Sequence, residues 1–251
     1  MFPSSTRRRA SRFRLTAVGA SLIAASAVVG LAGAPAQAAT TPAPVDAAAA
    51  AKAAAAKAAA AKAAAAKAAA ARAAAAKAAA VRAGNARLRN SRVFVVGDSL
   101  TVGAEPYIVN GLGSTVAHVS VNGRVSRPTD EGVSLLSSSS PSRIWVVALG
   151  TNDEADPVAT RHWVDTVMAR AGKNRKVIWL TLVRPGNYGV VNAEIKRLDA
   201  RYSNLYVIDW AAQVARNPQW LGGDGVHMNS TGYRYRGEAI VRAIWAVGRL
   251  P

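Results

Sequence analysis

The stretch VFVVGDSL at residues 93–100 decides the fold of this chain. Its first four residues are apolar, and three of them are valines. A run of this kind that ends in a Gly-Asp-Ser turn is typical of a buried parallel strand, and open α/β sheets place their sites at the carboxyl ends of such strands. Ser99 is therefore a candidate nucleophile. Because a serine hydroxyl is a weak nucleophile at its free pKa, the hypothesis requires a base, a group that orients the base, and donors for an oxyanion.

Apolar runs alternate with helical patterns through residues 90–251, the segment that contains this stretch. Continuous apolar strands separated by helices predict a three-layer α/β/α domain with a five-stranded, mostly parallel sheet and right-handed crossovers. The expected strands are residues 92–96, 115–121, 143–149, 176–182 and 205–210. The clearest expected helices are residues 158–171, 191–202 and 232–247.

The N-terminal region has the layout of an export signal. Five arginines within residues 7–14 precede the uncharged stretch 15–34, which is followed by Ala36-Gln37-Ala38. This order predicts a secretory signal peptide over residues 1–38, cleaved after Ala38. An uncleaved membrane anchor is the alternative, because the apolar stretch is long enough to span a bilayer. Residues 39–46 contain two prolines and are expected to form a short spacer.

Residues 47–89 form a low-complexity segment in which alanine is interrupted by a lysine or arginine at every fifth position. We expect a helix over residues 47–83, with Asp46 as its N-cap and Gly84-Asn85 as its stop, about 55 Å long. A spacing of five turns each charge by about 140°, so the charges wind over every face and leave no apolar stripe. The segment is thus predicted to be a solitary, semi-rigid linker.

The formal net charge of +18 is unevenly distributed along the chain. Residues 1–46 carry +4, residues 47–92 carry +10, and residues 93–251 carry only +4. The strong basicity therefore belongs to the leader and the linker, and the α/β domain itself does not indicate nucleic-acid binding. The absence of cysteine and the presence of only three histidines argue against disulfides and a structural zinc site. We expect chemistry without a metal or a cofactor.

Four polar blocks fall at the ends of the expected elements: Gly97-Asp98-Ser99-Leu100, Asn122-Gly123-Arg124, Gly150-Thr151-Asn152-Asp153 and Asp224-Gly225-Val226-His227. Their order and placement resemble the SGNH or GDSL superfamily of serine esterases and acyl transferases, which is named for Ser, Gly, Asn and His in four blocks. The resemblance covers about the last 160 residues and implies an SGNH or flavodoxin-like arrangement of the sheet. It also implies ester chemistry on a serine.

Each block has a physical interpretation. His227 is the one histidine at an expected strand-to-helix loop with an acid nearby, and Asp224 can hold its Nδ1–H so that Nε2 faces Ser99. The N–H groups of Ser99 and Gly123, with the Asn152 amide, could form an oxyanion hole. We expect Asp98 to hydrogen-bond the turn. His118 and His162 are assigned structural roles.

Simpler interpretations of the blocks remain open at this point. Gly-Asp-Ser can be a turn with a helix cap, Gly-Thr-Asn-Asp can be an Asx turn, and Asp224 and His227 can be surface residues. The coincidence of all four blocks at one edge of a single expected sheet favours the catalytic interpretation.

A narrower resemblance rests on residues 121–127, on residues 149–152, and on Asn217-Pro218-Gln219-Trp220 before Asp224. These segments are similar to the extracytoplasmic SGNH domains of bacterial peptidoglycan O-acetyltransferases, which move or remove acetyl groups on cell-wall sugars. No multi-span membrane domain precedes the blocks here, so hydrolysis and transfer both stay open. Trp220 and Tyr233 flank the His227 loop and could stack on a sugar ring, although core packing is the alternative for both.

The sequence as a whole predicts a secreted serine O-acyl esterase, with acyl transfer also possible, acting on small acyl esters such as O-acetyl groups of cell-envelope glycans. The basic helix is expected to contact an anionic envelope polymer. Two hypotheses from other classes stay open: a catalytically silent cell-wall-binding module, and a nucleic-acid-binding protein that uses the polycationic segment. The predicted location is secreted or cell-wall associated, or membrane-anchored if the leader is not cleaved.

Overall fold

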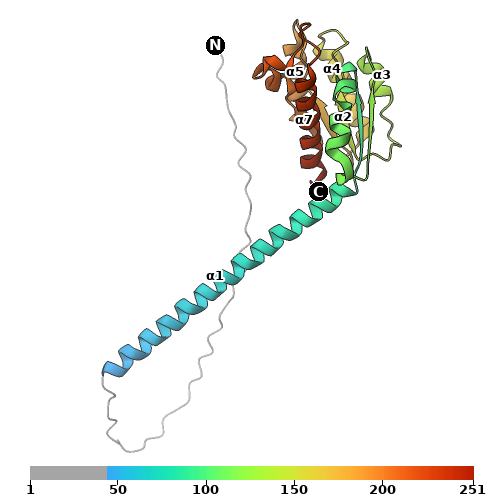
Figure 1. Ribbon diagram of the computed structural model, residues 1–251. Coiled ribbons are helices and arrows are strands. Elements are labelled where there is room, and N and C mark those ends of the chain that lie inside the picture. The colour runs from blue at the N-terminus through green and yellow to red at the C-terminus, as the bar shows by residue number, and fades with distance from the viewer. Residues whose placement is uncertain (1–43) are drawn as a thin grey trace, which may run out of the picture. The chain divides into compact units, whose positions relative to one another are not determined.

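The computed structural model describes residues 44–251 and contains one parallel β-sheet within them (Figure 1). The strands are β1 (Arg92–Gly97), β2 (His118–Gly123), β3 (Ile144–Ala148), β4 (Lys176–Leu180) and β5 (Leu205–Ile208). The α-helices are α1 (Pro44–Arg89), α2 (Ser99–Leu112), α3 (Thr129–Ser134), α4 (Pro157–Ala171), α5 (Tyr188–Asp199), α6 (Trp210–Ala215) and α7 (Ser230–Gly248). Short 3₁₀ turns occur at Gly113–Thr115 and Pro218–Trp220.

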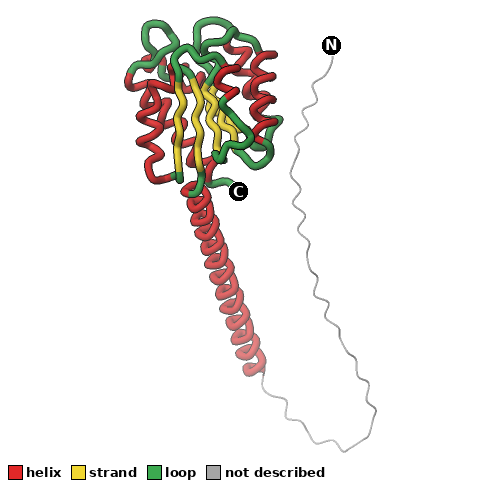
Figure 2. The backbone as a smooth tube through the Cα atoms, turned by 90° about the vertical axis from the view of Figure 1, so that its right-hand side faces the viewer, coloured by secondary structure: helices red, strands yellow, loops and turns green. Residues whose placement is uncertain are grey.

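The sheet is covered by helices on both faces, which makes the α/β domain a three-layer structure (Figure 2). Val93 and Val95 of β1 point toward α2 and α7, which lie side by side on one face (Figure 1). Val96 points to the other face, where α3, α4 and α5 pack. All three valines are fully buried, as expected for a central strand with a helix layer on each side. The predicted three-layer α/β/α fold is confirmed.

The strand order places the polar blocks together. The order is β2-β1-β3-β4-β5, and all four strand pairings are parallel. Gly97 at the end of β1 is in register with Gly123 of β2 and with Ala148 of β3. The connection that leaves β1 runs toward β2 and the one that leaves β3 runs toward β4, and open α/β sheets bind ligands at such a switch point.

Several predicted bounds are wrong by a few residues, for identifiable reasons. The second strand begins at His118, because α2 continues to Leu112 and a 3₁₀ turn follows it. The fifth strand ends at Ile208, because Asp209 caps a short helix, α6, that the sequence did not predict. Helix α5 lies at Tyr188–Asp199, three residues earlier than expected at both ends.

The bounds of α1 also differ from the prediction. The helix begins at Pro44, so Asp46 lies inside the first turn, and proline is well suited to that position. It also continues through Gly84-Asn85 to Arg89. A Cβ at Gly84 would lie 3.2 Å from the carbonyl oxygen of Arg249, so this glycine permits a close approach and does not end the helix.

The last turn of α1 belongs to the core of the α/β domain. Leu88 is 4% exposed and packs in the cluster that contains α2 and α7. The Asn85 side chain accepts a 2.9 Å hydrogen bond from Arg249. Residues 47–83, in contrast, are all exposed. The prediction of a solitary helix therefore fails for its final turn, because a few apolar and polar contacts join that turn to the C-terminal end of α7.

None of the helices within residues 44–251 is long and apolar enough to cross a membrane. The predicted signal peptide, its cleavage site at Ala38 and most of the proline-containing spacer lie outside the described residues.

Candidate active site

The end of β1 presents Ser99 at the start of a helix. The Asp98 side chain caps α2 by accepting a 3.0 Å hydrogen bond from the Leu100 N–H, so it binds the turn as expected. Ser99 is the first residue of α2, and its N–H has no partner within the helix. A Cβ at Gly97 would overlap the Thr101 side chain and lie 2.9 Å from the Ala148 carbonyl oxygen. Only glycine fits this point, where strand and helix meet.

Ser99, His227 and Asp224 form a chain of hydrogen bonds. Ser99 Oγ lies 3.0 Å from His227 Nε2, and His227 Nδ1 lies 2.6 Å from Asp224 Oδ2. The other carboxylate oxygen of Asp224 accepts hydrogen bonds from the N–H groups of Val226 (3.0 Å) and His227 (2.9 Å). The structure thus brings together the three predicted residues in the order hydroxyl, imidazole, carboxylate, which is the arrangement of a serine hydrolase triad.

These hydrogen bonds hold Asp224 in its charged form. The hydrogen bond from His227, followed by the backbone donors of Val226 and His227, lowers the pKa of Asp224 to about 2. The side chains of His227 and Asp224 are 49% and 51% exposed. These two side chains therefore lie at an open surface.

The loop that carries Asp224 and His227 is closed by its own backbone. The Gly222 N–H donates to the His227 carbonyl at 2.7 Å, and Leu221 and Met228 form an antiparallel bridge. Gly225 has φ +68°, the left-handed conformation that glycine adopts without strain. His227 is placed by this loop and by the start of α7, which Asn229 caps through a hydrogen bond from the Gly232 N–H.

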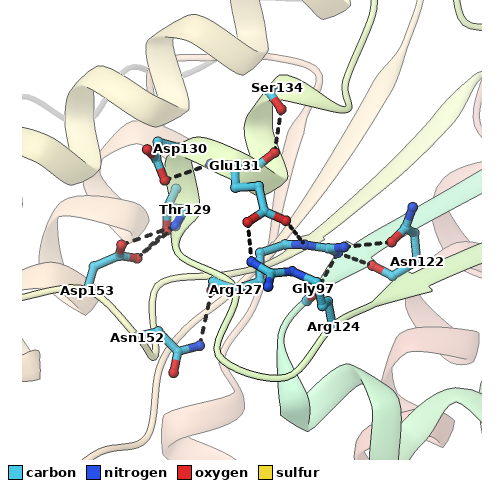
Figure 3. Close-up of polar contacts among 10 residues, drawn as sticks. All are labelled: Gly97, Asn122, Arg124, Arg127, Thr129, Asp130, Glu131, Ser134, Asn152 and Asp153. Atoms are coloured by element: carbon cyan, nitrogen blue, oxygen red, sulfur yellow. Dashed lines mark hydrogen bonds and ion pairs between the residues drawn. The ribbon is translucent and has the colours of Figure 1, made fainter.

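Asn152 lies in the loop after β3, which several long-range contacts hold in place (Figure 3). The Asp153 carboxylate accepts hydrogen bonds from Thr129, at 3.1 Å from N–H and 2.5 Å from the hydroxyl. The Tyr188 hydroxyl donates to the Asp153 carbonyl at 2.5 Å. Asn152 Nδ2 donates one hydrogen to the Arg127 carbonyl at 3.0 Å. An amide nitrogen carries two hydrogens, so one remains for an oxyanion.

Gly123 ends β2 beside the first turns of α2. A Cβ at this position would lie 2.9 Å from the Val102 backbone nitrogen, so the glycine allows β2 to approach the helix that carries Ser99. This placement is consistent with the second polar block lying next to Ser99. The roles of the Gly123 N–H and the Asn152 amide as oxyanion donors stay predictions.

Two buried arginines near the site were missed by the sequence analysis. Arg127 is 4% exposed and binds the ends of β1 and β2 (Figure 3). Arg236 of α7 is 2% exposed and lies over the ring of Trp210. Burial lowers the pKa of Arg236 to about 10. Burial also raises the pKa of Asp98, and the positive charge of Arg236 opposes this increase. Both arginines lie among other polar and charged residues, so nothing in the local sequence distinguishes them from exposed arginines.

Trp220 offers little ring surface for stacking on a sugar. Trp220 is 8% exposed, and its ring stacks on those of Trp210 (5.8 Å between centroids) and Tyr235 (4.4 Å). The packing alternative therefore holds for Trp220. Tyr233 is only partly buried and lies against Gly103 of α2, so its role in substrate binding remains a prediction.

The other two histidines lie outside this site. His118 is exposed at the first position of β2, and His162 is exposed on α4 with its ring edge against Trp163. Within the part of the chain that the structure describes, no group of three or more His, Cys, Asp or Glu side chains is placed to hold a metal ion.

Comparison with known proteins identifies the fold. No protein-family model and no curated protein sequence matches this chain. The C-terminal catalytic domain of Streptococcus pneumoniae peptidoglycan O-acetyltransferase A, solved with a methylsulfonyl adduct, is similar over 64% of this chain and 96% of that one, with 19% identity and a TM-score of 0.55. A lipolytic G-D-S-L protein from Veillonella parvula is similar over 61% and 97%, with 19% identity and a TM-score of 0.50. The chain therefore has the fold of the SGNH/GDSL hydrolases.

Proposed function

We propose that this protein is a serine O-acyl esterase that acts at the bacterial cell envelope. The observation that carries the proposal is the hydrogen-bonded chain from Ser99 Oγ through His227 to Asp224, at 3.0 Å and 2.6 Å. Both distances are within the range of a nucleophile with its base and of a base with its orienting group. The place of Ser99 at the switch point of the sheet supports the same conclusion.

In the proposed reaction, Ser99 attacks the carbonyl carbon of an ester while His227 Nε2 accepts its proton. Asp224 stays ionised, holds the imidazole in the tautomer with a proton on Nδ1, and stabilises the imidazolium that forms. The tetrahedral oxyanion is held by the N–H groups of Ser99 and Gly123 and by the free amide hydrogen of Asn152. His227 then returns the proton to the leaving alcohol, and water or a second alcohol releases the acyl group from Ser99.

The substrate class is proposed to be small acyl esters of glycans, above all O-acetyl groups. Support comes from the half-exposed triad, which leaves space for a polymeric alcohol, and from the fold shared with a peptidoglycan O-acetyltransferase domain. The same exposure lets a sugar hydroxyl compete with water for the acyl-enzyme, so acyl transfer is a second outcome of the same chemistry. We propose that the protein is secreted and remains at the cell wall through its basic helix.

The test is turnover of a short-chain aryl ester and release of acetate from O-acetylated cell-wall glycan. Ser99→Ala should abolish both activities, because no other group of the triad can form the acyl-enzyme. Asn152→Ala should lower kcat about a hundredfold or more if its amide is an oxyanion donor. A fluorophosphonate probe should label the wild type and leave Ser99→Ala unlabelled.

Ser138→Ala is the matched control, since Ser138 is an exposed serine in the loop before β3, at the opposite edge of the sheet. It should behave as the wild type in every assay. Undiminished turnover by Ser99→Ala would contradict the esterase assignment. Absence of turnover and of probe labelling in the wild type, together with retention on cell wall, would favour the silent binding module. Retention on nucleic acid instead would favour the polycationic binding protein.

A further inference from the structure

We propose that Arg127 is the positioning residue of the oxyanion hole, and that it holds the three donor groups in their relative places through contacts of both its side chain and its backbone. This inference rests on the proposed esterase function and extends it to a residue outside the triad. The three predicted donors come from the ends of β1, β2 and β3. Arg127 contacts all three of these segments.

The guanidinium of Arg127 ties β1 to β2. Its Nη1 donates to the Gly97 carbonyl at 2.9 Å and to the Asn122 carbonyl at 2.5 Å, and its Nη2 donates to Asn122 Oδ1 at 2.8 Å (Figure 3). Gly97 lies two residues before Ser99, and Asn122 directly precedes Gly123. One planar group with a fixed fork of donors thus sets the distance between the strand ends that carry the first and second donors.

The backbone of Arg127 places the third donor. Its carbonyl accepts the hydrogen bond from Asn152 Nδ2 at 3.0 Å, which fixes the orientation of that amide (Figure 3). The residue before it, Ser126, has φ +57°, an unusual conformation for a residue with a side chain. This tight turn brings the Arg127 side chain toward the strands and its carbonyl toward the β3 loop. A displacement of Arg127 would therefore move the donors of both regions.

The burial of Arg127 argues that these contacts are specific. Its side chain is 5% exposed, and its ion pair with the 42% exposed Glu131 is a single contact of 3.2 Å. A buried cation is unfavourable unless its donors are satisfied, and here two backbone carbonyls and the Asn122 side-chain oxygen at the strand ends supply three of its four acceptors. Arg124 offers a direct contrast, because it also pairs with Glu131 but is 49% exposed, and no side-chain contact joins it to the strand ends.

The experiment compares Arg127→Met, which keeps the length and apolar stem, with Arg124→Met as the matched control, both in the full-length protein. With a short-chain aryl ester, Arg127→Met should lower kcat by about a hundredfold, the effect of removing one oxyanion donor, and should change KM far less. Binding of a boronic acid, which forms a tetrahedral adduct on the serine, should weaken by a similar factor. Arg124→Met should leave kcat, KM and boronate binding unchanged.

A double-mutant cycle with Asn152→Ala separates positioning from general loss of structure. If Arg127 acts by aiming Asn152, removal of the amide should lower kcat clearly less in Arg127→Met than in the wild type. Arg127→Lys, which keeps the charge but not the fork, should recover only part of kcat. Should Arg127→Met not fold, as judged by thermal unfolding, Asn122→Ala provides the test, since it removes one acceptor and should lower kcat about threefold to tenfold.

The outcomes distinguish this inference from the proposed function. An active wild type whose Arg127→Met variant keeps full kcat, or loses activity only through a higher KM, would overturn the positioning role and leave the esterase function intact. Strictly additive effects of Arg127→Met and Asn152→Ala would also overturn it. A wild type without ester turnover would instead overturn the proposed function itself.

Discussion

Replacing Leu88 by alanine should destabilise the α/β domain, although residue 88 belongs to the Ala/Lys helix. Leu88 is 4% exposed, and its Cδ1 faces the space beside Gly248, close to Ile144. Glycine has no side chain that could move into the gap, so the cavity would persist. Leucine-to-alanine substitutions at such sites lower the free energy of unfolding by about 2–5 kcal/mol. For a domain of this size that corresponds to a fall in Tm on the order of 10 °C.

Tryptophan fluorescence during thermal unfolding is the suitable assay, because all six tryptophans lie in residues 145–245 and none in α1. Val81→Ala is the matched control, since Val81 is an apolar residue of the same helix that is 56% exposed. It should leave Tm within about 2 °C of the wild type.

A rescue experiment tests the same contact. A Cβ at Gly248 would lie 2.6 Å from Leu88 Cδ1, so Gly248→Ala alone should destabilise the domain by overpacking. Combined with Leu88→Ala, the added methyl group should fill part of the cavity and restore part of the lost Tm. Equal Tm values for Leu88→Ala and Val81→Ala would refute the reasoning. In that case the domain would begin at residue 90, as the sequence predicts.

Three further predictions concern the site and the linker. Trp220→Ala should lower the free energy of unfolding by about 3–5 kcal/mol in chemical denaturation, because its stacked ring fills the core, and should not selectively raise KM. The pKa of Asp224 is about 2, below its free value of about 3.9, so its carboxylate stabilises the native state above about pH 4 and loses this effect as the pH falls toward 2. The carboxylate is therefore ionised at every pH from about 5 to about 8. Because Asp224→Asn removes the charge that orients His227, it should lower kcat by roughly 10³-fold or more across this range in pH-rate profiles. Deletion of residues 47–83, all exposed, should leave kcat on a soluble ester unchanged and lower salt-sensitive retention on isolated cell wall in a pull-down.

The arrangement of Ser99, His227 and Asp224 could be predicted from the sequence because its contacts are local or follow from the topology of the sheet. Asp224 and His227 are three residues apart, and the carboxylate reaches both the imidazole and the backbone of the same loop. Ser99 follows a strand whose composition alone predicts a central position. Parallel strands place their carboxyl ends at one edge, and the order of the four polar blocks, with the resemblance that they carry, predicted that the loop of His227 lies there too.

The contacts that escaped prediction join residues far apart in the chain. Arg127 binds Gly97, which lies 30 residues earlier, and accepts from Asn152, which lies 25 residues later. Arg87 donates to the carbonyl of Arg249 across 162 residues, and this contact accompanies the continuation of α1 past Gly84. Helix propensity favours a stop at Gly-Asn, but packing against α7 outweighs it. Trp220 likewise looked available for a sugar only because its stacking partners, Trp210 and Tyr235, lie in separate elements.

This difference between local and distant contacts divides the site into two parts with different sensitivity to change. The proposed base, His227, and its carboxylate lie in one self-closed loop, which is linked to the proposed nucleophile by the hydrogen bond between Ser99 and His227. A displacement of that loop should remove proton transfer but leave the proposed oxyanion donors in place, and such donors alone support residual catalysis in serine hydrolases. The proposed oxyanion donors, in contrast, come from three strand ends that Arg127 joins by hydrogen bonds, so a change at this one residue should disturb them jointly. Loss of Arg127 should therefore weaken binding of a tetrahedral adduct, whereas loss of Asp224 should chiefly impair its formation through proton transfer.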